Sequence, residues 1–393
     1  MKFKEIQLGN LFEAKYGKSL PKNQRRDGNI KVYGSGGISG YHDTALVKGP
    51  GIVIGRKGTV GSLYYEKQDY FPIDTTYYIE KSDKYDLKYI FYLLNTLNLN
   101  KMNTHSAVPG LNRENLYSLI AKVPEKKYQI KISEFLQQLD SKIELNNQII
   151  SNLEELASTL FKRWFVDFEF PDENGNPYKS SGGKMVDSEL GEIPEGWEVT
   201  NLEEISIDII TGKTPNTKQK ENYGEDIPFI KIPDMHNNTY IVQTETYLSK
   251  KGSDSQYKKL LPKDSICVSC IATPGLVSIT SVASHTNQQI NTILPKVEDL
   301  YFLYLDLKRK RNLIRELGSG GSTTLNLNKT QFGKINIINC GKREKMNFNK
   351  ICEPLFSKIL LLQKSNIYLA KLRDSLLPKL LSGEIELPED EEV

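Results

Sequence analysis

The sequence predicts a chain of the α+β (mixed α/β) class, with two mixed α/β domains and two long helices that can bury their seams on each other. Three observations lead to this architecture. The chain has 393 residues, of which 38% are hydrophobic, so it can bury at least two cores of about 100 to 200 residues each. A long segment occurs twice at one constant spacing, and both copies carry a heptad pattern. We therefore expect a pseudo-twofold internal repeat.

The repeat is clearest in the second half of each copy. Ser106 to Phe165 aligns without a gap with Ser322 to Leu381, at a constant offset of 216 residues. Sixty residues in one register are hard to obtain by chance. Shorter pieces upstream match more loosely: Gly17-Lys18-Ser19 with Gly212-Lys213-Thr214, and Thr59-Val60-Gly61 with Thr273-Pro274-Gly275. The two copies thus share a helical end and differ most in their first hundred residues.

The shared end is predicted to be helical because its seam residues recur at steps of four and three, which is a heptad stripe. Such a stripe often packs onto its own domain, but two long helices of one chain can also bury their seams on each other. Asn146 and Asn366 are polar seam residues, which cost stability but can fix register. Pro378 is expected to interrupt the second helix near its end. The seams are Leu139, Ile143, Asn146, Ile150, Leu153, Ala157 and Leu160 in the first helix, and Leu355, Ile359, Leu362, Asn366, Leu369, Arg373 and Leu376 in the second.

The chain divides into segments in the following order. We expect a first α/β domain over residues 1–125, a central spacer helix over 126–165, a linker over 166–190, a second α/β domain over 191–345, a C-terminal spacer helix over 346–382 and an acidic tail over 383–393. The segment 166–190 is rich in Pro, Gly, Ser and acidic residues, as is typical of a linker or long surface loop. Expected strands are Gly51–Ile54, Tyr77–Ile79, Ser265–Ile271 and Ile290–Leu294, and expected domain helices are Leu87–Leu97 and Leu300–Leu317.

The charge is small overall and unevenly distributed. The net charge is +3 for the whole chain, but residues 1–125 have a net charge of +6 and residues 191–345 of +2. Acidic residues gather in residues 166–190, with a net charge of −4, and in the tail. Because the first domain is basic, a polyanion such as nucleic acid remains a candidate partner.

Composition excludes several classes of protein. Four cysteines in so long a chain do not make a disulfide scaffold and suit a reducing compartment. The chain begins without the apolar run of a signal peptide, and no stretch approaches about 18 uninterrupted apolar residues, so a membrane partner is not expected. We expect a cytoplasmic protein.

Catalytic and metal-binding motifs are not found in the sequence. Gly17-Lys18-Ser19 and Gly212-Lys213-Thr214 resemble the end of a phosphate-binding loop, but Phe12 and Ile207 stand where it requires glycine. Cys267 and Cys270 have metal-ligand spacing in an apolar strand without a second ligand pair, which favours two buried thiols. The four histidines show no metal spacing, and no residue set assembles a nucleophile, a base and an orienting group. We expect no catalytic residues and no metal site.

Loop residues in both domains suit contact with a polyanion. Lys and Arg supply salt-dependent affinity, small residues allow the backbone to approach a duplex, and Arg, Asn or Gln can read a base edge. A solvated basic surface is the alternative for each residue. The candidates are Lys18, Lys22, Arg25, Arg26, Tyr33, Ser35, Arg56, Lys57 and Thr59 in the first domain, and Lys213, Thr214, Lys218, Lys220, Thr273, Gln288, Gln289 and Asn291 in the second.

Three segments of the chain resemble the specificity subunits of type I restriction-modification enzymes. These are Glu189-Leu-Gly-Glu-Ile-Pro-Glu-Gly-Trp197, Phe161-Lys-Arg-Trp-Phe-Val-Asp-Phe168 and Leu372-Arg-Asp-Ser-Leu-Leu-Pro-Lys-Leu-Leu-Ser-Gly-Glu384. Ile54 to Gly61 and Thr286 to Thr292 are similar to segments of that family's target recognition domains. The resemblance covers nearly the whole chain.

The resemblance implies two target recognition domains separated by two long helices that form an antiparallel coiled coil. The two domains would read a bipartite asymmetric site in double-stranded DNA. The resemblance also implies two modification (methyltransferase) subunits, which bind S-adenosylmethionine, and two restriction (motor-nuclease) subunits, which use ATP and Mg. This chain would bind none of these cofactors and would catalyse nothing itself. Two alternatives stay open, namely a self-contained DNA-modifying enzyme and a coiled-coil scaffold for protein interactions without DNA contact.

Overall fold

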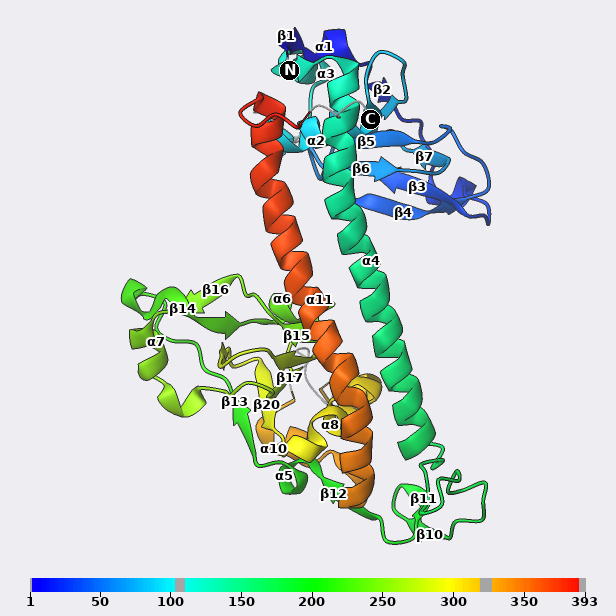
Figure 1. The fold of residues 1–393 in the computed structure, drawn as a ribbon, viewed down its shortest axis with the longest axis vertical. Coiled ribbons are helices and arrows are strands. Elements are labelled where there is room, and N and C mark those ends of the chain that lie inside the picture. Colours follow the sequence, from blue (N-terminus) through cyan, green and yellow to red (C-terminus); the bar gives the residue numbers. More distant parts are fainter. Residues whose placement is uncertain (1, 103–109, 319–326, 389–393) are drawn as a thin grey trace. The chain divides into compact units, whose positions relative to one another are not determined.

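The computed structural model describes residues 2–102, 110–318 and 327–388, which belong to two units. Unit 1 consists of residues 1–143 and 368–393, and unit 2 of residues 144–367. Two long helices, α4 (Lys126–Phe165) and α11 (Lys342–Ser382), each contribute residues to both units (Figure 1). The first residues of both repeated segments and the end of the expected acidic tail lie outside the described residues.

Unit 1 contains one four-stranded antiparallel sheet and two smaller sheets. The four-stranded sheet has the order β2-β8-β5-β6, the three-stranded sheet has the order β4-β3-β7 with β3 and β7 parallel, and β1 pairs with β9. The strands are β1 (Phe3–Gln7), β2 (Lys15–Tyr16), β3 (Ile30–Gly34), β4 (Gly37–His42), β5 (Gly51–Gly55), β6 (Leu63–Glu66), β7 (Tyr70–Pro72), β8 (Thr76–Glu80) and β9 (Ile120–Pro124). The helices besides α4 and α11 are α1 (Leu8–Leu11), α2 (Leu87–Thr96) and α3 (Arg113–Ser118).

Unit 2 repeats this plan and adds strands to it. Its large sheet has the order β13-β20-β17-β18-β15, its three-stranded sheet has the order β16-β14-β19, and β12 pairs with β21. The strands are β10 (Met185–Ser188), β11 (Gly191–Pro194), β12 (Glu198–Asn201), β13 (Asp208–Thr211), β14 (Tyr223–Ile230), β15 (Tyr240–Ile241), β16 (Thr246–Leu248), β17 (Ile266–Ser269), β18 (Val277–Thr280), β19 (His285–Thr286), β20 (Ile290–Leu294) and β21 (Asn336–Asn339). The helices are α5 (Leu202–Ile205), α6 (Ile232–Met235), α7 (Lys250–Asp254), α8 (Leu300–Arg309), α9 (Arg311–Gly318) and α10 (Lys329–Gly333).

The register of the strands confirms the internal repeat. Tyr16 of β2 lies opposite Tyr77 of β8, and Thr211 of β13 lies opposite Asn291 of β20. The strand β5 pairs with β8 and β6 as β17 pairs with β20 and β18. Unit 2 differs by the added edge strand β15 and by the hairpin of β10 and β11. The mixed helix-and-sheet class predicted from the sequence is confirmed.

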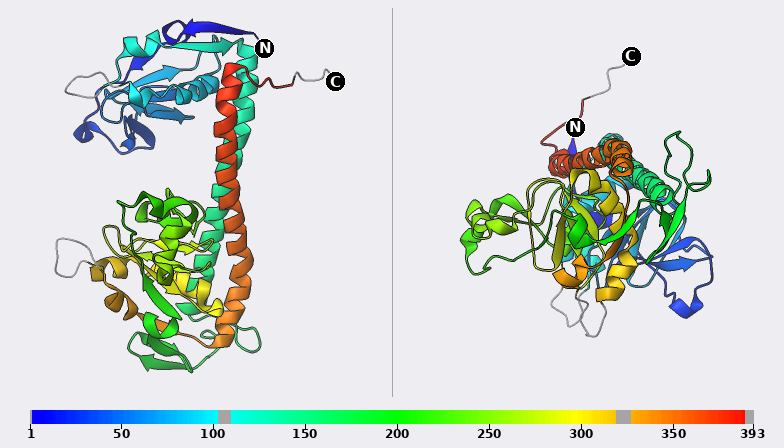
Figure 2. Two further views of the ribbon diagram at one scale, coloured as in Figure 1. Left: turned by 90° about the vertical axis from the view of Figure 1, so that its left-hand side faces the viewer. Right: turned by 90° about the horizontal axis from the view of Figure 1, so that it is seen from below.

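Within each unit, α4 and α11 lie side by side and run in opposite directions (Figures 1 and 2). In unit 2, Asn146 contacts Asn366 near one end, and the ring of Phe161 lies 6.0 Å from that of Phe348 toward the other. Helix α11 continues through Pro378 to Ser382, so the expected interruption is wrong. Proline removes only one hydrogen bond there, and the last turns are held by the buried side chains of Leu377, Leu380 and Leu381.

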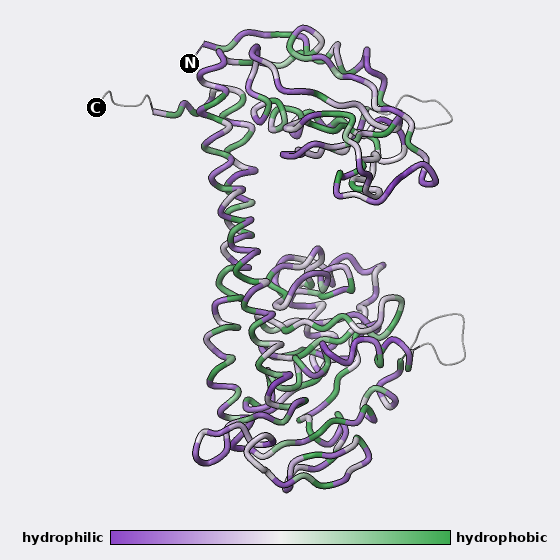
Figure 3. The backbone as a smooth tube through the Cα atoms, turned by 90° about the vertical axis from the view of Figure 1, so that its right-hand side faces the viewer, coloured by the Kyte–Doolittle hydropathy of each residue, from purple (hydrophilic) through white to green (hydrophobic). Residues whose placement is uncertain are grey.

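The seam residues face inward. Each of the twelve apolar or asparagine positions named for the seams, which are Leu139, Ile143, Asn146, Ile150, Leu153, Leu160, Leu355, Ile359, Leu362, Asn366, Leu369 and Leu376, is buried or half-buried. By contrast, Leu145, Leu156 and Leu361 are 47%, 53% and 58% exposed. Hydrophobic and hydrophilic stretches accordingly alternate along both long helices (Figure 3).

The two seam asparagines meet within unit 2. The Nδ2 atom of Asn146 donates to Oδ1 of Asn366 at 2.8 Å, and Nδ2 of Asn366 donates to Oδ1 of Asn147 at 2.8 Å. Asn146 is fully buried and its own Oδ1 has no hydrogen-bond partner. Burying a polar pair costs stability unless the pair is matched, so a shift of one helix along the other is disfavoured.

The segment 166–190 is not a free linker. The ring of Phe170 stacks on Trp197 at 4.8 Å and on Tyr178 at 4.6 Å, and Phe168 and Phe170 belong to the core of unit 2. Its polar and glycine residues pointed to an exposed loop, but its aromatic side chains bury enough apolar surface to hold it against the unit.

The expected helix over Leu300–Leu317 is broken into α8 and α9 at Lys310. The Nζ atom of Lys310 turns back to the carboxylate of Asp306 and to the carbonyl of Asn336 at 2.9 Å. The ion pair with Asp306 is an i,i+4 pair of the helix, and the bond to Asn336 ties the end of α8 to β21. Within the described part of the chain, none of the helices combines the length and apolar character that a membrane span requires.

Candidate nucleic-acid interface

In unit 1, the turn after β2, the loop after β5 and the segment before β8 meet at one end of the four-stranded sheet. The backbone N–H of Gly17 donates to the carbonyl of Thr76 at 3.1 Å, and that of Arg56 donates to Thr75 at 2.9 Å. A Cβ atom at residue 17 would lie 2.1 Å from the carbonyl oxygen of Ile73. Only glycine permits this close approach, which brings the turn onto the next loop.

Unit 2 holds its loops with the same hydrogen bonds. The N–H of Gly212 donates to the carbonyl of Ile290 at 3.2 Å, and that of Cys270 donates to Gln289 at 2.9 Å. A Cβ atom at residue 212 would lie 2.2 Å from the carbonyl oxygen of Asn287. The glycines that matched in sequence therefore do the same structural work in both units.

The loops after β5 and β17 also share their backbone shape. Each loop has two residues with positive φ, namely Gly58 and Gly61 in unit 1 and Ala272 and Gly275 in unit 2. Each loop is also bonded to the repeated segment. The N–H of Leu111 donates to the carbonyl of Arg56 at 2.8 Å, and the N–H of Leu327 donates to the carbonyl of Cys270 at 3.0 Å. Two copies of one backbone frame thus present different side chains.

The candidate residues of unit 1 separate into accessible and internally bonded groups. Lys18, Lys22, Lys57 and Thr59 are exposed, and Arg56 is half-buried. Arg26 is also exposed, and its guanidinium pairs with Asp43, with Nε 2.7 Å from Oδ2. The loop around residues 56–59 therefore carries most of the candidates without a carboxylate partner among the described residues.

Three candidates of unit 1 serve the fold. Tyr33 and Ser35 are buried, with the Tyr33 hydroxyl 2.8 Å from the carboxylate of Glu66. Burial and this hydrogen bond raise the pKa of Tyr33 above its ordinary value of 10.0. Arg25 donates to the carbonyls of Ser39 at 2.7 Å and Leu20 at 3.4 Å. These hydrogen bonds hold the three side chains within unit 1, and their contact with DNA stays a prediction.

In unit 2, the accessible candidates are mainly lysines and amides. Lys213, Lys218, Lys220 and Gln288 are exposed, and Thr214, Thr273 and Gln289 are half-buried. The Oγ1 atom of Thr214 donates to Oε1 of Gln288 at 2.6 Å, which fixes the plane of that exposed amide.

Asn291 does not face a ligand. It is buried, and its Nδ2 lies 3.2 Å from Sγ of Cys270 while its Oδ1 accepts from Thr211 at 2.6 Å. In this structure β20 turns the side chain inward, and its predicted contact with DNA stays a prediction. Cys267 and Cys270 are free, buried thiols as expected, and burial raises their pKa values to about 12 and about 11.

Sequence reasoning found Arg56 but missed the side chains around it, Arg113, Tyr16 and Tyr77, which form an aromatic and basic cluster in unit 1. The guanidinium carbon of Arg56 lies 5.2 Å from the centre of the Tyr16 ring, and that of Arg113 lies 4.8 Å from it. Tyr77 stands edge-on to Tyr16 at 5.0 Å. Burial is the largest cause that raises the pKa of Tyr77, to about 12. The available signal was the repeat, which places a basic residue, Lys329, at the position that matches Arg113.

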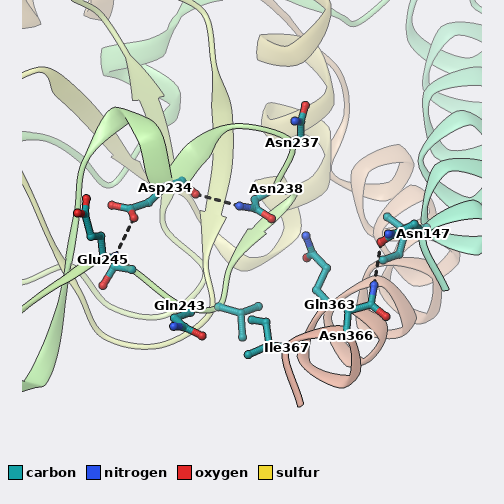
Figure 4. A pocket seen from close by; sticks show the side chains of 12 residues that line it. Asn147, Asp234, Asn237, Asn238, Gln243, Glu245, Gln363, Asn366 and Ile367 are labelled. Carbon is teal, nitrogen blue, oxygen red and sulfur yellow. Dashed lines mark hydrogen bonds between the residues drawn. The ribbon is translucent and has the colours of Figure 1, made fainter. Parts of the chain in front are cut away.

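A different kind of cavity lies within unit 2, with a volume of about 440 Å³. Its polar lining consists of amides together with Asp234, Glu245 and Thr244, and it contains no Lys or Arg. Figure 4 shows Asn147 and Asn366 bonded on one wall and Asp234 bonded to Asn238 and Glu245 on the other. Two carboxylates without a cation do not suit a phosphate, so this cavity is not part of the interface. Among the described ranges, no group of three or more His, Cys, Asp or Glu side chains is placed to hold a metal ion.

Comparisons with known proteins agree with this arrangement. A family model described as the type I restriction modification DNA specificity domain matches residues 1–155 and 194–366. The specificity subunit of the type I restriction enzyme HindI from Haemophilus influenzae is 40% identical over 329 residues, which cover 70% of this chain and 71% of that protein. The MjaIX specificity subunit from Methanocaldococcus jannaschii is 28% identical over 316 residues, covering 77% of this chain and 70% of the relative.

A solved structure extends the likeness over the whole chain. The crystal structure of the S subunit of a type I restriction-modification system from M. genitalium has a TM-score of 0.63, with coverage of 99% of this chain and 97% of that one. At 18% identity this likeness supports the fold. Two matched α/β units with unlike loops define a chain of the DNA-specificity class. The chain belongs to the family of type I restriction-modification DNA specificity subunits, and the resemblance seen in the sequence is confirmed.

Proposed function

We propose that this chain is the sequence-specific DNA-binding subunit of a type I restriction-modification complex. Each unit reads one half of a bipartite, asymmetric site in double-stranded DNA. The chain also provides the scaffold on which two methyltransferase subunits and two motor-nuclease subunits assemble, and it catalyses no step itself. The cytoplasmic location expected from the sequence remains a prediction.

The observation that carries this proposal is the pair of matched loop frames. Gly17 and Gly212 approach the neighbouring loop in the same way, and Arg56 and Cys270 make the same backbone hydrogen bonds. The side chains on these frames differ, with Arg56 and Lys57 in unit 1 against Cys270 and Ile271 in unit 2. One backbone that carries two sets of side chains suits two half-sites of different sequence.

The helices α4 and α11 are the proposed spacer. Each helix contributes residues to both units, so the length of helix between the units sets the number of unread base pairs between the half-sites. Removing one helical turn from both helices is expected to change that number, since one turn of helix rises about 5.4 Å and one base-pair step about 3.4 Å.

Sequencing of modified bases in cells with and without the gene tests the proposal. We expect one bipartite methylated motif that disappears on deletion and returns on complementation. Methylation of DNA by the purified chain with S-adenosylmethionine alone would instead favour a self-contained enzyme. A complex that assembles but protects no DNA in a footprint would favour a protein scaffold.

A further inference from the structure

A shallow hollow of about 280 Å³ in unit 1 joins two of the predicted residues, Arg56 and Lys57, to three that the sequence did not indicate, Arg113, Tyr16 and Tyr77. Three cations line it, Arg56, Lys57 and Arg113, together with Tyr16 and Tyr77. Among the described residues, no carboxylate forms an ion pair with any of these cations. The neighbouring segment 103–109 contains no Asp or Glu in its sequence. The hollow therefore concentrates positive charge that the described part of the fold does not neutralise.

The aromatic rings hold the two guanidinium groups in place. Arg56 lies over Tyr16 and Tyr77 at 5.2 and 5.8 Å, and Arg113 lies over Tyr16 at 4.8 Å. Tyr77 is itself fixed, because its hydroxyl donates to the carbonyl of Leu111 at 3.0 Å. A planar guanidinium that stacks on a ring engages its face and keeps its in-plane N–H donors for another acceptor.

The donors of these guanidiniums are incompletely used. The Nε atoms of both Arg56 and Arg113 are buried and have no hydrogen-bond partner. Since these Nε atoms are closed to solvent, an oxyanion in the hollow would meet the terminal amino groups, which a guanidinium presents as a pair of donors. Lys57, which is exposed beside them, adds a third positive charge.

The matched position in unit 2 has a different chemistry. Thr211, Cys270, Ile271 and Asn291 replace Tyr16, Arg56, Lys57 and Tyr77, and they close the site with hydrogen bonds among three of them. Lys329, which matches Arg113, faces the carboxylate of Asp208 at 3.6 Å. The cationic hollow is thus a property of unit 1 alone among the two matched sites.

We propose that Arg56, Lys57 and Arg113 form a binding site for a backbone phosphodiester of duplex DNA, and that unit 2 has no such site at the matched position. This inference rests on the proposed function and adds to it a difference between the halves. Unit 1 holds the sugar-phosphate backbone through a charged anchor, whereas the equivalent place in unit 2 is filled by neutral groups that bond one another. A guanine edge is the rival acceptor for one arginine, but three uncompensated cations match a charged oxygen better than a neutral base.

The salt dependence of DNA binding tests the site. The full chain is assembled with its methyltransferase partner, and the affinity for a duplex that carries the target is measured over a series of salt concentrations. Arg113→Gln and Lys57→Gln are each expected to lower the slope of log affinity against log salt by about 0.9, the value for one lost phosphate contact. The loss of affinity should be the same for target and non-target duplexes.

Two further variants serve as controls. Lys329→Gln, at the matched position of unit 2, should leave the slope unchanged, and Arg113→Lys should keep it because the charge remains. The melting temperature of each complex shows whether it has folded. Since Lys57 is exposed, Lys57→Gln should fold even where Arg113→Gln does not.

Several outcomes would overturn the inference. An unchanged slope in both glutamine variants means that the cluster only stabilises the loop. A changed base preference in Arg113→Gln with an unchanged slope assigns the arginine to a base edge. If inorganic phosphate stabilises the wild-type complex but not Arg113→Gln, while the slope for DNA is the same in both, the site takes a free anion. Failure of the wild-type complex to bind its target would count against the proposed function itself, whereas specific binding with an unaffected slope would sink only the phosphate site.

Discussion

The two units share a backbone frame, but unit 1 carries charged side chains at positions where unit 2 carries neutral ones. In the loop after β5, unit 1 has Arg56; in the matching loop after β17, unit 2 has the buried Cys270. In the strand that follows, unit 1 has the buried carboxylate of Glu66 where unit 2 has the buried hydroxyl of Thr280. Charged groups in unit 1 thus correspond to neutral groups in unit 2. The difference shows that the glycine turns and backbone hydrogen bonds define the frame, while the side chains on it are free to vary.

The helical ends differ in the same systematic way. Phe161, Trp164 and Phe165 of α4 pack in unit 2, and the residues 216 positions later in α11, Leu377, Leu380 and Leu381, pack in unit 1. Aromatic side chains bury more surface than leucines and gain from ring contacts, so the helix junction of unit 2 should be the stiffer of the two.

The largest expected effect breaks the aromatic junction. Phe348 is fully buried among the rings of Phe161 and Phe165, and Phe348→Ala should destabilise unit 2 by about 3 to 5 kcal/mol. Its matched residue in unit 1, Ile132, is fully buried too, and Ile132→Val should cost unit 1 about 0.5 to 1.5 kcal/mol. Hydrogen exchange followed by mass spectrometry measures each unit separately. Equal acceleration of exchange in both units by Phe348→Ala would contradict the assignment of this core to unit 2 alone.

A second prediction concerns the buried asparagine pair of unit 2. Asn366→Leu leaves the fully buried Nδ2 of Asn146 without its acceptor, which should cost about 1 to 3 kcal/mol. Replacing both asparagines by leucine should restore the stability, because no buried polar group is then left unpaired. The exposed Leu145 supplies the control, since Leu145→Ala should change the free energy of unfolding by less than about 0.5 kcal/mol. A double variant as unstable as the single one would show that the hydrogen bond is not the cause.

The internal repeat and the heptad pattern allowed the fold to be predicted from the sequence. The residues of the candidate site were harder to predict. The spacing of Asn146 and Asn366 in their heptads pointed to the seam without reference to any other contact. The side chains of Tyr33, Ser35 and Asn291 looked available because they lie near glycines and other polar residues. Strand pairing turns Tyr33 and Asn291 inward, and Ser35 is held in its turn by a hydrogen bond to the carbonyl of Thr75. No local pattern gives this orientation, since it depends on which neighbouring strand covers the residue.

Arg113 illustrates a second limit. Its ring partner Tyr16 lies 97 residues earlier in the chain, in a strand only two residues long. Local propensity cannot join two such positions, because the contact arises from the pairing of β2 with β8 and from the bond between Leu111 and Arg56. Only comparison of the two repeats, which places Lys329 at the matching site, gave a usable signal.

Acid should distinguish the two units, beginning with unit 2. Its His285 is fully buried, with Nε2 2.9 Å from the Ser253 hydroxyl, and burial lowers the pKa of the imidazole below 6.5. The unfolded chain then binds the proton more readily than the folded one. The contribution of His285 to stability is therefore complete above about pH 6.5 and is lost as the pH falls toward the lower, folded pKa.

Unit 1 should respond only at lower pH. Burial acts to raise the pKa of Glu66, but hydrogen bonds from the Gln68 amide, Lys31 and Tyr33 outweigh it and lower the pKa below 4.5. This contribution is present above about pH 4.5 and is lost as the pH falls through the folded value. When the pH is lowered, hydrogen exchange should show that unit 2 opens before unit 1. His285→Gln should remove the earlier loss and Glu66→Gln the later one, and simultaneous loosening of both units would refute the assignment.

The smallest expected effect concerns base recognition by unit 2 alone. Gln288 is exposed, and its Oε1 accepts from Thr214 at 2.6 Å, so the amide plane is fixed and its N–H donors are left for a base edge. Thr214→Val keeps the shape of the side chain but removes this hydrogen bond. Discrimination at one base pair of the half-site read by unit 2 should fall by about 1 kcal/mol, roughly fivefold, while the other half-site is unaffected. Competition between the target and duplexes with single base changes measures both halves in one experiment.

The half-site read by unit 1 serves as the internal control. An equal loss of base discrimination in both half-sites would mean that Thr214 supports the frame as a whole. An unchanged base discrimination in both would remove Gln288 from the reading surface.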